Sequence, residues 1–170
     1  MPKQRYKLII IISIIAILIS SFTIGRQIYL GREPDIVSFS IIHFAGYLFF
    51  MLMPVEILFT YYLIEDVNLV ILLILALVTA MVAQIIDYLI GYLVSNHVIH
   101  KLIGEKKYKK TKKYMDKYGN LTVFVFNFLP LSSSVLSLVA GMLRYRFRNF
   151  VIYSLMGLSL KYFIIVLLFF

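Results

Sequence analysis

The chain has 170 residues, of which 62% are hydrophobic and 15% charged, and it contains no cysteine. This composition is typical of a one-domain membrane protein with several spans, and it excludes disulfide frameworks and thiolate chemistry. The net charge of +9 is concentrated in loops, so we interpret it as loops facing anionic lipid and not as a nucleic-acid surface.

The first apolar segment is expected to be a retained membrane anchor. Lys3, Arg5 and Lys7 precede an apolar run at 8–24, which is long for the apolar core of a signal peptide. No small-residue cleavage site follows this run, so a signal-anchor helix is favoured over a cleaved signal peptide.

Two later apolar stretches, 36–64 and 119–143, are each interrupted by a proline. Pro54 lies near the centre of the first and Pro130 near the centre of the second. Proline has no backbone N–H, and it biases the preceding residue, here Leu129, away from the helical conformation. Each stretch is therefore either one kinked span or a re-entrant hairpin that leaves the membrane by the side it entered.

Segment lengths and charge distinguish these alternatives. The arms on either side of Pro130 would be about 16–20 Å long as helices, too short for a hydrocarbon core of about 30 Å. Two hairpins would place fourteen Lys and Arg residues on one side and two on the other, whereas two full spans give ten against six. The positive-inside rule therefore favours two hairpins, with the N-terminus and the lysine-rich loop in the cytoplasm.

We therefore expect an all-α polytopic membrane protein in which two opposed re-entrant hairpins with flanking transmembrane helices form an inverted repeat. The expected segments of the single membrane domain 1–170 are a signal-anchor helix at 8–24, a first hairpin at 36–64, a transmembrane helix at 67–95, a basic cytoplasmic interfacial segment at 96–118, a second hairpin at 119–143 and a transmembrane helix at 149–170.

Polar residues inside apolar segments are the candidate functional residues, because ionised groups in a membrane cost a few kcal/mol unless paired or facing water. Glu56 follows the first proline, and the alternative to a functional role is a neutral carboxyl that satisfies backbone groups freed by Pro54. Lys161 needs a partner, for which Glu56 and Asp87 are the candidates. The residues expected at a transport site where the hairpin tips meet are Glu56, Asp87, Asn127, Pro130, Ser132, Ser133 and Lys161.

Small residues and prolines are expected to shape the fold around this site. Gln84, Asp87 and Gly91 share one helix face, which we expect to point into protein or water. Ser137 and Gly141 belong to a small face suited to close helix packing. The residues assigned to hairpin geometry or packing are Pro54, Gly91, Gly119, Ser137, Gly141 and Gly157.

The segment 96–118 carries eight lysines between positions 101 and 117. We interpret Lys101 to Lys117 as a helix on the cytoplasmic membrane surface with anionic headgroups as partners; a merely solvated charge run is the alternative. His97 and His100 lie three residues apart, but no carboxylate or cysteine pattern accompanies them, so no metal and no cofactor is expected.

Several short motifs in this order resemble the DedA family, also known as the VTT or SNARE-associated Golgi protein family. The resemblance covers roughly 45–165, and its motifs are Pro54-Val-Glu56, Tyr88-Leu-Ile-Gly91, Tyr118-Gly119, Asn127-Phe128-Leu129-Pro130 and Ala140-Gly141-Met142, with Phe150 and Gly157 continuing the spacing. The resemblance implies two opposed re-entrant hairpins and the movement of polyprenyl-phosphate carriers or phospholipids between leaflets.

The chain departs from the family pattern at three polar positions. The family's arginines three residues before and after the hairpin proline fall on Asn127 and Ser133, and its usual Asp falls on Gln84. Arginine is the natural clamp for phosphate, so these positions bear directly on headgroup binding. Lys161 is a candidate replacement cation.

The leading hypothesis is a lipid flippase or scramblase in the plasma membrane of a prokaryote. The alternatives are a proton- or ion-coupled small-solute transporter that uses Glu56 and Asp87, and a non-transporting membrane scaffold. An enzyme is not expected, because no nucleophile–base pair, metal set or phosphate loop is present. Membrane lipids are the expected partners, and a homo-oligomer is left open.

Overall fold

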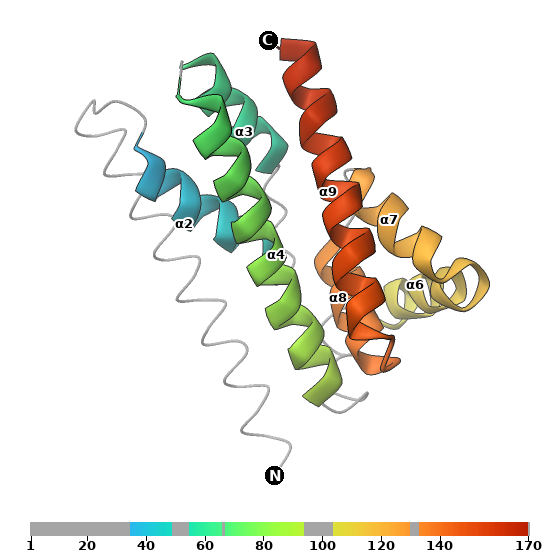
Figure 1. Cartoon of the computed structure of the whole chain (residues 1–170). Helices are drawn as coiled ribbons and strands as arrows, with labels where there is room; N and C mark the ends of the chain where they lie inside the picture. Colours follow the sequence, from blue (N-terminus) through green and yellow to red (C-terminus); the bar gives the residue numbers. More distant parts are fainter. Residues whose placement is uncertain (1–34, 49–54, 66, 94–103, 130–132, 170) are drawn as a thin grey trace.

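The structure, a computed structural model, describes residues 35–48, 55–65, 67–93, 104–129 and 133–169. Within these ranges the chain forms α-helices and no β-strand, which confirms the all-helical class (Figure 1). The helices are α2 (Ile36–Tyr47), α3 (Val55–Ile64), α4 (Leu69–Leu93), α6 (Glu105–Tyr118), α7 (Asn120–Phe128), α8 (Ser133–Met142) and α9 (Phe147–Phe169). The expected anchor at 8–24 lies outside the described residues.

The two long helices, α4 and α9, run antiparallel through the molecule (Figure 1). They contain 25 and 23 residues, which corresponds to about 38 and 35 Å and suffices for a hydrocarbon core of about 30 Å. By length and composition, both helices are able to cross a membrane. Large apolar side chains, among them Val78 and Leu89 on α4 and Phe163 and Leu167 on α9, are exposed. The helices occupy the positions at which the sequence predicts spans.

Each proline-interrupted stretch contains two short helices, α2 and α3 in the first and α7 and α8 in the second. The longest, α2, has 12 residues, so none exceeds about 18 Å. Leu129 ends α7 in an extended conformation with φ −83° and ψ 155°, as predicted for a residue that precedes proline. Pro54 and Pro130 themselves lie outside the described residues.

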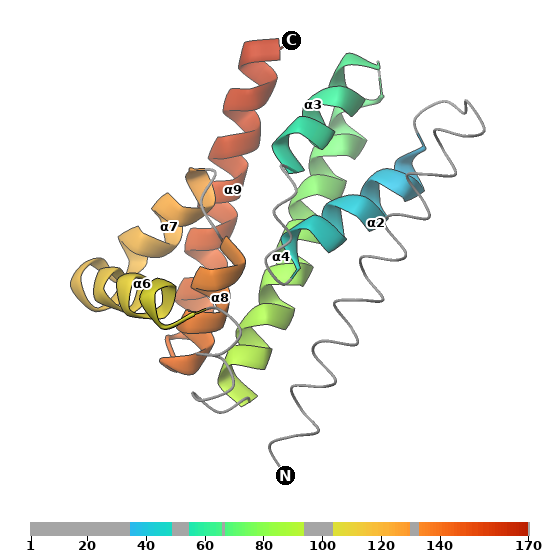
Figure 2. The same cartoon turned by 180° about the vertical axis from the view of Figure 1, so that it is seen from behind.

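The short helices pack on the long ones in a reciprocal pattern. α2 contacts α4, and α7 contacts α9, so the first helix of each stretch lies on the long helix that follows it. α3 contacts α9, and α8 contacts α4, so the second helix of each stretch also packs on the long helix of the other half. Figure 2 shows α2 crossing α4 and α7 lying beside α9.

α4 and α8 approach so closely that both crossing positions require glycine. A Cβ atom at Gly91 would collide with the backbone carbonyl of Leu138, and one at Gly141 with the backbone carbonyl of Tyr88. Ser137, one turn before Gly141, is completely buried. Small residues allow helix backbones to approach in this way inside membranes.

α6 is a basic helix that packs on α7 and α8 (Figure 2). Its buried residues are Tyr108, Thr111 and Met115, and its lysines are exposed. Tyr118, the last residue of α6, is 46% exposed. Gly119 separates α6 from α7 with a φ of +48°, a conformation that favours glycine. The apolar face of α6 is thus directed at the protein.

Candidate functional site

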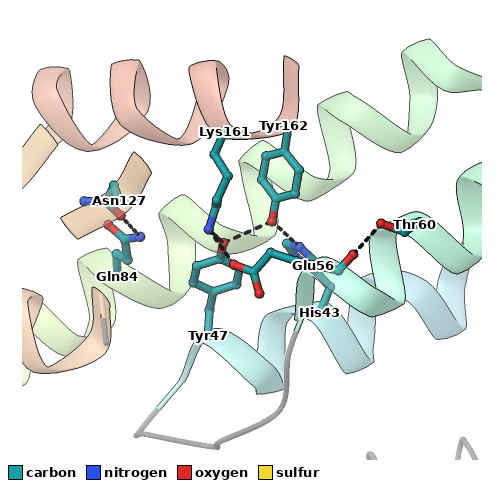
Figure 3. Close-up of polar contacts among 8 residues, drawn as sticks. All are labelled: His43, Tyr47, Glu56, Thr60, Gln84, Asn127, Lys161 and Tyr162. Carbon is teal, nitrogen blue, oxygen red and sulfur yellow. Dashed lines mark hydrogen bonds and ion pairs between the residues drawn. The ribbon is translucent and has the colours of Figure 1, made fainter. Parts of the chain in front are cut away.

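A buried ion pair joins α3 to α9. Lys161 Nζ lies 2.8 Å from Glu56 Oε1 and 2.7 Å from the hydroxyl oxygen of Tyr47 on α2 (Figure 3). The side chain of Lys161 is 9% exposed and that of Glu56 is 27% exposed, so the carboxylate is the more accessible partner. Of the two carboxylates predicted as partners of Lys161, the structure places Glu56 beside it. The pair must offset the desolvation of both charged groups.

A chain of hydrogen bonds continues from the ion pair into the interior (Figure 3). The hydroxyl oxygens of Tyr47 and Tyr162 lie 3.0 Å apart, and that of Tyr162 lies 2.7 Å from His43 Nε2. His43 Nδ1 lies 2.7 Å from the hydroxyl oxygen of Thr79 on α4. The three rings are at most 3% exposed. We refer to these six residues, His43, Tyr47, Glu56, Thr79, Lys161 and Tyr162, as the ion-pair cluster.

The hydroxyl of Thr79 fixes the direction of this chain. Its single proton is donated to the carbonyl oxygen of Leu75 at 2.6 Å, so Thr79 accepts a hydrogen bond from Nδ1–H of His43. His43 Nε2 then accepts from Tyr162, and Tyr162 accepts from Tyr47. Tyr47 has no further proton and accepts from the lysine ammonium. Every group in the chain is therefore satisfied when the lysine is charged and the histidine is neutral.

A second cluster, the amide cluster, is formed by Gln84 on α4, Asn127 on α7 and Ser154 on α9. Gln84 Nε2 donates to Asn127 Oδ1 at 2.5 Å, and Asn127 Nδ2 donates to Ser154 Oγ at 3.1 Å. All three residues are fully buried. Gln84 Oε1 has no hydrogen-bond partner among the described residues. The cluster therefore contains a buried acceptor that a polar ligand could satisfy.

The two clusters lie on one face of α9. Ser154 and Lys161 are seven residues apart, which corresponds to two helical turns and about 10 Å along the axis. Gly157 lies between them, where a Cβ atom would be 2.5 Å from the carbonyl oxygen of Phe124 on α7. α7 and α9 are therefore in backbone contact beside the amide cluster. Figure 3 shows Gln84 and Asn127 of the amide cluster to one side of Lys161 and its partners.

The other predicted site residues are distributed as follows. Asp87 lies on α4, one turn beyond the amide cluster, and is fully buried. Ser133 is buried at the start of α8, and its carbonyl oxygen accepts a 2.8 Å hydrogen bond from the Ser137 hydroxyl. Pro130 and Ser132 lie outside the described residues. The structure thus joins Glu56 to Lys161 and places Asn127 in a separate cluster.

Sequence reasoning did not identify Tyr47, Thr79, Ser154 or Tyr162 as site residues. The chain contains 13 tyrosines, so their presence carries no signal by itself. Two weak signals exist in retrospect, because Tyr162 directly follows Lys161 and Tyr47 lies one helical turn after a histidine in an apolar segment.

The chemistry available at these clusters is electrostatic and hydrogen-bonding. Among the described residues, no group of three His, Asp or Glu side chains is placed to hold a metal ion. His97 and His100 lie outside the described residues. The ion-pair cluster offers a cation, a carboxylate and hydroxyls, and the amide cluster offers neutral donors and acceptors. Such groups bind and orient a charged or polar molecule.

Comparison with known proteins gives a match to a family model. The family model described as the VTT domain matches residues 36–170, which includes every described helix. No curated protein and no solved structure matches the chain.

Proposed function

The chain belongs to the VTT domain family, the domain of DedA and SNARE-associated proteins, and we propose that it moves lipids between membrane leaflets as a flippase or scramblase. Proteins with this domain are membrane proteins, so the chain is a membrane protein of the DedA type. The proposed substrates are phospholipids or polyprenyl-phosphate lipids, and no covalent step is involved.

The observation that carries this proposal is the pair of polar clusters along one face of α9. A largely buried Lys161–Glu56 pair is costly among apolar helices, so its presence supports a functional role. Fixed polar groups would lower the cost of moving a headgroup through hydrocarbon while the acyl tails stay in lipid. Glu56 is the partly exposed member of the pair, so we propose that a headgroup first meets the site there.

The reciprocal packing of the short helices supports two opposed hairpins. An inverted repeat relates α2, α3 and α4 to α7, α8 and α9. It therefore predicts that α2 packs on α4 as α7 packs on α9, and that α3 packs on α9 as α8 packs on α4. Both relations are observed. In such repeats substrate sites lie near the midplane between the two halves, and both polar clusters contain residues from the two halves of the proposed repeat.

Two departures from the family pattern are in contact in this chain. Gln84 stands where the family has an acid, and Asn127 where it has an arginine, and the two amides are hydrogen-bonded at 2.5 Å. A neutral pair thus occupies the positions of a charged one. Among the described residues, Lys161 is the lysine or arginine that is buried. We therefore propose that a phosphate headgroup is attracted to Lys161.

We propose that the protein lies in the plasma membrane of a prokaryote, with the N-terminus and the lysine-rich segment in the cytoplasm. Cysteines introduced at Lys110 and at Arg146 should both react with a membrane-impermeant thiol reagent from the cytoplasmic side. A cysteine at Arg32 should react from the outside. The natural chain has no cysteine, so the unmodified protein serves as the blank. Labelling of Lys110 and Arg146 positions from opposite faces would rule out the second hairpin.

A proton-coupled solute carrier is the second candidate, favoured by the directional hydrogen-bond chain that begins at Lys161, the ion-pair partner of Glu56. A carrier of this kind needs the carboxylate to change charge, whereas a scramblase needs only its polar shape. In liposomes containing the protein and a fluorescent phospholipid or polyprenyl phosphate, we expect exchange between leaflets that changes little with an imposed pH gradient. Glu56→Gln should slow exchange only modestly. Exchange driven strongly by the gradient and abolished by Glu56→Gln would favour the coupled carrier.

A further inference from the structure

A groove of about 580 Å³ lies where α6 meets α7 and α8, and none of its lining residues belongs to either polar cluster. Lys107, Lys110 and Tyr114 line it from α6, and Leu121, Val125 and Phe126 line it from α7. We propose that this groove binds one anionic lipid, with the phosphate on the two lysines and one acyl chain along α7. Its volume is within the range of about 300–1,000 Å³ typical of ligand pockets.

Two lysine ammonium groups at the groove are available to bind an external anion. Lys107 and Lys110 are one turn apart on the same face of α6, and neither forms an ion pair within the described part of the chain. Lys109, which does not line the groove, pairs instead with Glu105 at 2.8 Å. Two ammonium groups one turn apart suit a single phosphate with several acceptor oxygens.

The remaining lining favours a lipid over a free phosphate. Leu121 is 56% exposed and Val125 and Phe126 are half-buried, so an apolar wall on α7 continues directly from the lysines. A free phosphate would bind the lysines but leave the apolar wall uncovered, whereas the acyl chain of a lipid would cover it. The Thr122 hydroxyl donates to the carbonyl oxygen of Tyr114 at 2.8 Å and ties α6 to α7, so both walls are fixed relative to each other.

This proposal goes beyond lipid transport, because it requires only that α6 lies at the membrane surface. A bound lipid would seat α6 against the first helix of the second proline-interrupted stretch. Its test measures binding, so it can fail while leaflet exchange is observed, and it can succeed while exchange is absent.

The test is native mass spectrometry of the full chain in detergent, titrated with phosphatidylglycerol or phosphatidylcholine. We expect one phosphatidylglycerol to be retained in preference to phosphatidylcholine. The double variant Lys107→Gln/Lys110→Gln should weaken phosphatidylglycerol binding on the order of tenfold. Both lysines are exposed, so the variant should fold normally.

The matched control is Lys106→Gln/Lys113→Gln, which removes the same charge from exposed positions that do not line the groove. It should change phosphatidylglycerol binding by less than about twofold. An equal loss of binding in both double variants would show that the lipid is attracted by the overall charge of α6, and it would overturn the proposal that the groove is the binding site.

Two further arms identify the ligand. Val125→Trp fills the groove beside the apolar wall without changing the charge. It should weaken retention of phosphatidylglycerol as strongly as the lysine double variant. Retention at the unmodified level would exclude the acyl chain from the groove. Competition by millimolar glycerol phosphate should be absent; displacement of the lipid at that concentration would indicate a free-phosphate site and overturn the lipid assignment.

Discussion

Lys161→Met is expected to destabilise the protein by about 3 kcal/mol, because the substitution leaves Glu56 as a carboxylate without its cation. Methionine keeps the unbranched shape of lysine but provides no donor for Glu56 or for Tyr47, which both accept from Nζ. In a chain of this size the loss corresponds to a fall of about 8 °C in the unfolding temperature. Thermal unfolding in detergent, followed by circular dichroism, measures it.

The partner is identified by a double-mutant cycle. Glu56→Gln alone should also destabilise the protein, because it leaves a lysine that is nearly buried. The combination with Lys161→Met should cost less than the sum of the two, with a coupling energy on the order of 1–3 kcal/mol. Asp87→Asn combined with Lys161→Met should be additive. If the two destabilisations in the Glu56 cycle simply add, the interaction between Glu56 and Lys161 contributes no coupling energy to the stability of the protein.

Lys109→Met is a closely matched control. Lys109 forms an ion pair with Glu105 at 2.8 Å, the same separation as in the buried pair, but the two side chains are 72% and 66% exposed. Exposed pairs contribute only about 0–1 kcal/mol. The unfolding temperature of Lys109→Met should therefore remain close to that of the unmodified protein. A loss as large as that of Lys161→Met would show that burial is not the reason for the effect.

The helical framework could be predicted because local chemistry controls it. Proline at 130 requires an extended residue before it, and Leu129 is extended. Uninterrupted apolar runs produced the long helices α4 and α9 at the expected positions. The cost of an unpaired charge in an apolar segment also predicts a partner for Lys161, and Glu56 and Asp87 are the candidate carboxylates within the other apolar segments.

The hydrogen-bonded chain could not be predicted, because it depends on how α2 crosses the long helices. His43 and Tyr162 are 119 positions apart in sequence, and no spacing rule connects them. The contact between Gln84 and Asn127 likewise follows from the packing of α7 beside α9 and α4. The sequence marks each amide separately as a departure from the pattern of the family it resembles, but only the fold shows that the two side chains are hydrogen-bonded to each other.

Asn127→Leu is expected to have the largest effect on transport. Leucine replaces the amide with apolar volume and leaves the buried side chains of Gln84 and Ser154 without their partner. A polar group left unpaired costs about 1–3 kcal/mol, and a headgroup that loses a partner of this kind during passage meets a barrier raised by that amount, which slows exchange by about 5- to 150-fold. Ser137→Ala is the matched control, because it removes a buried hydroxyl that, among the described residues, bonds only within its own helix and lies outside both clusters.

The most direct test of the account is the rate at which a fluorescent lipid exchanges between the leaflets of liposomes that contain the purified protein. Circular dichroism and size-exclusion chromatography establish that each variant is folded. The account predicts exchange well above that of protein-free liposomes, an unchanged rate for Ser137→Ala and a rate lower by about tenfold for Asn127→Leu. Folded protein that supports no exchange above the protein-free rate, or Asn127→Leu that exchanges lipid at the unmodified rate, would contradict it.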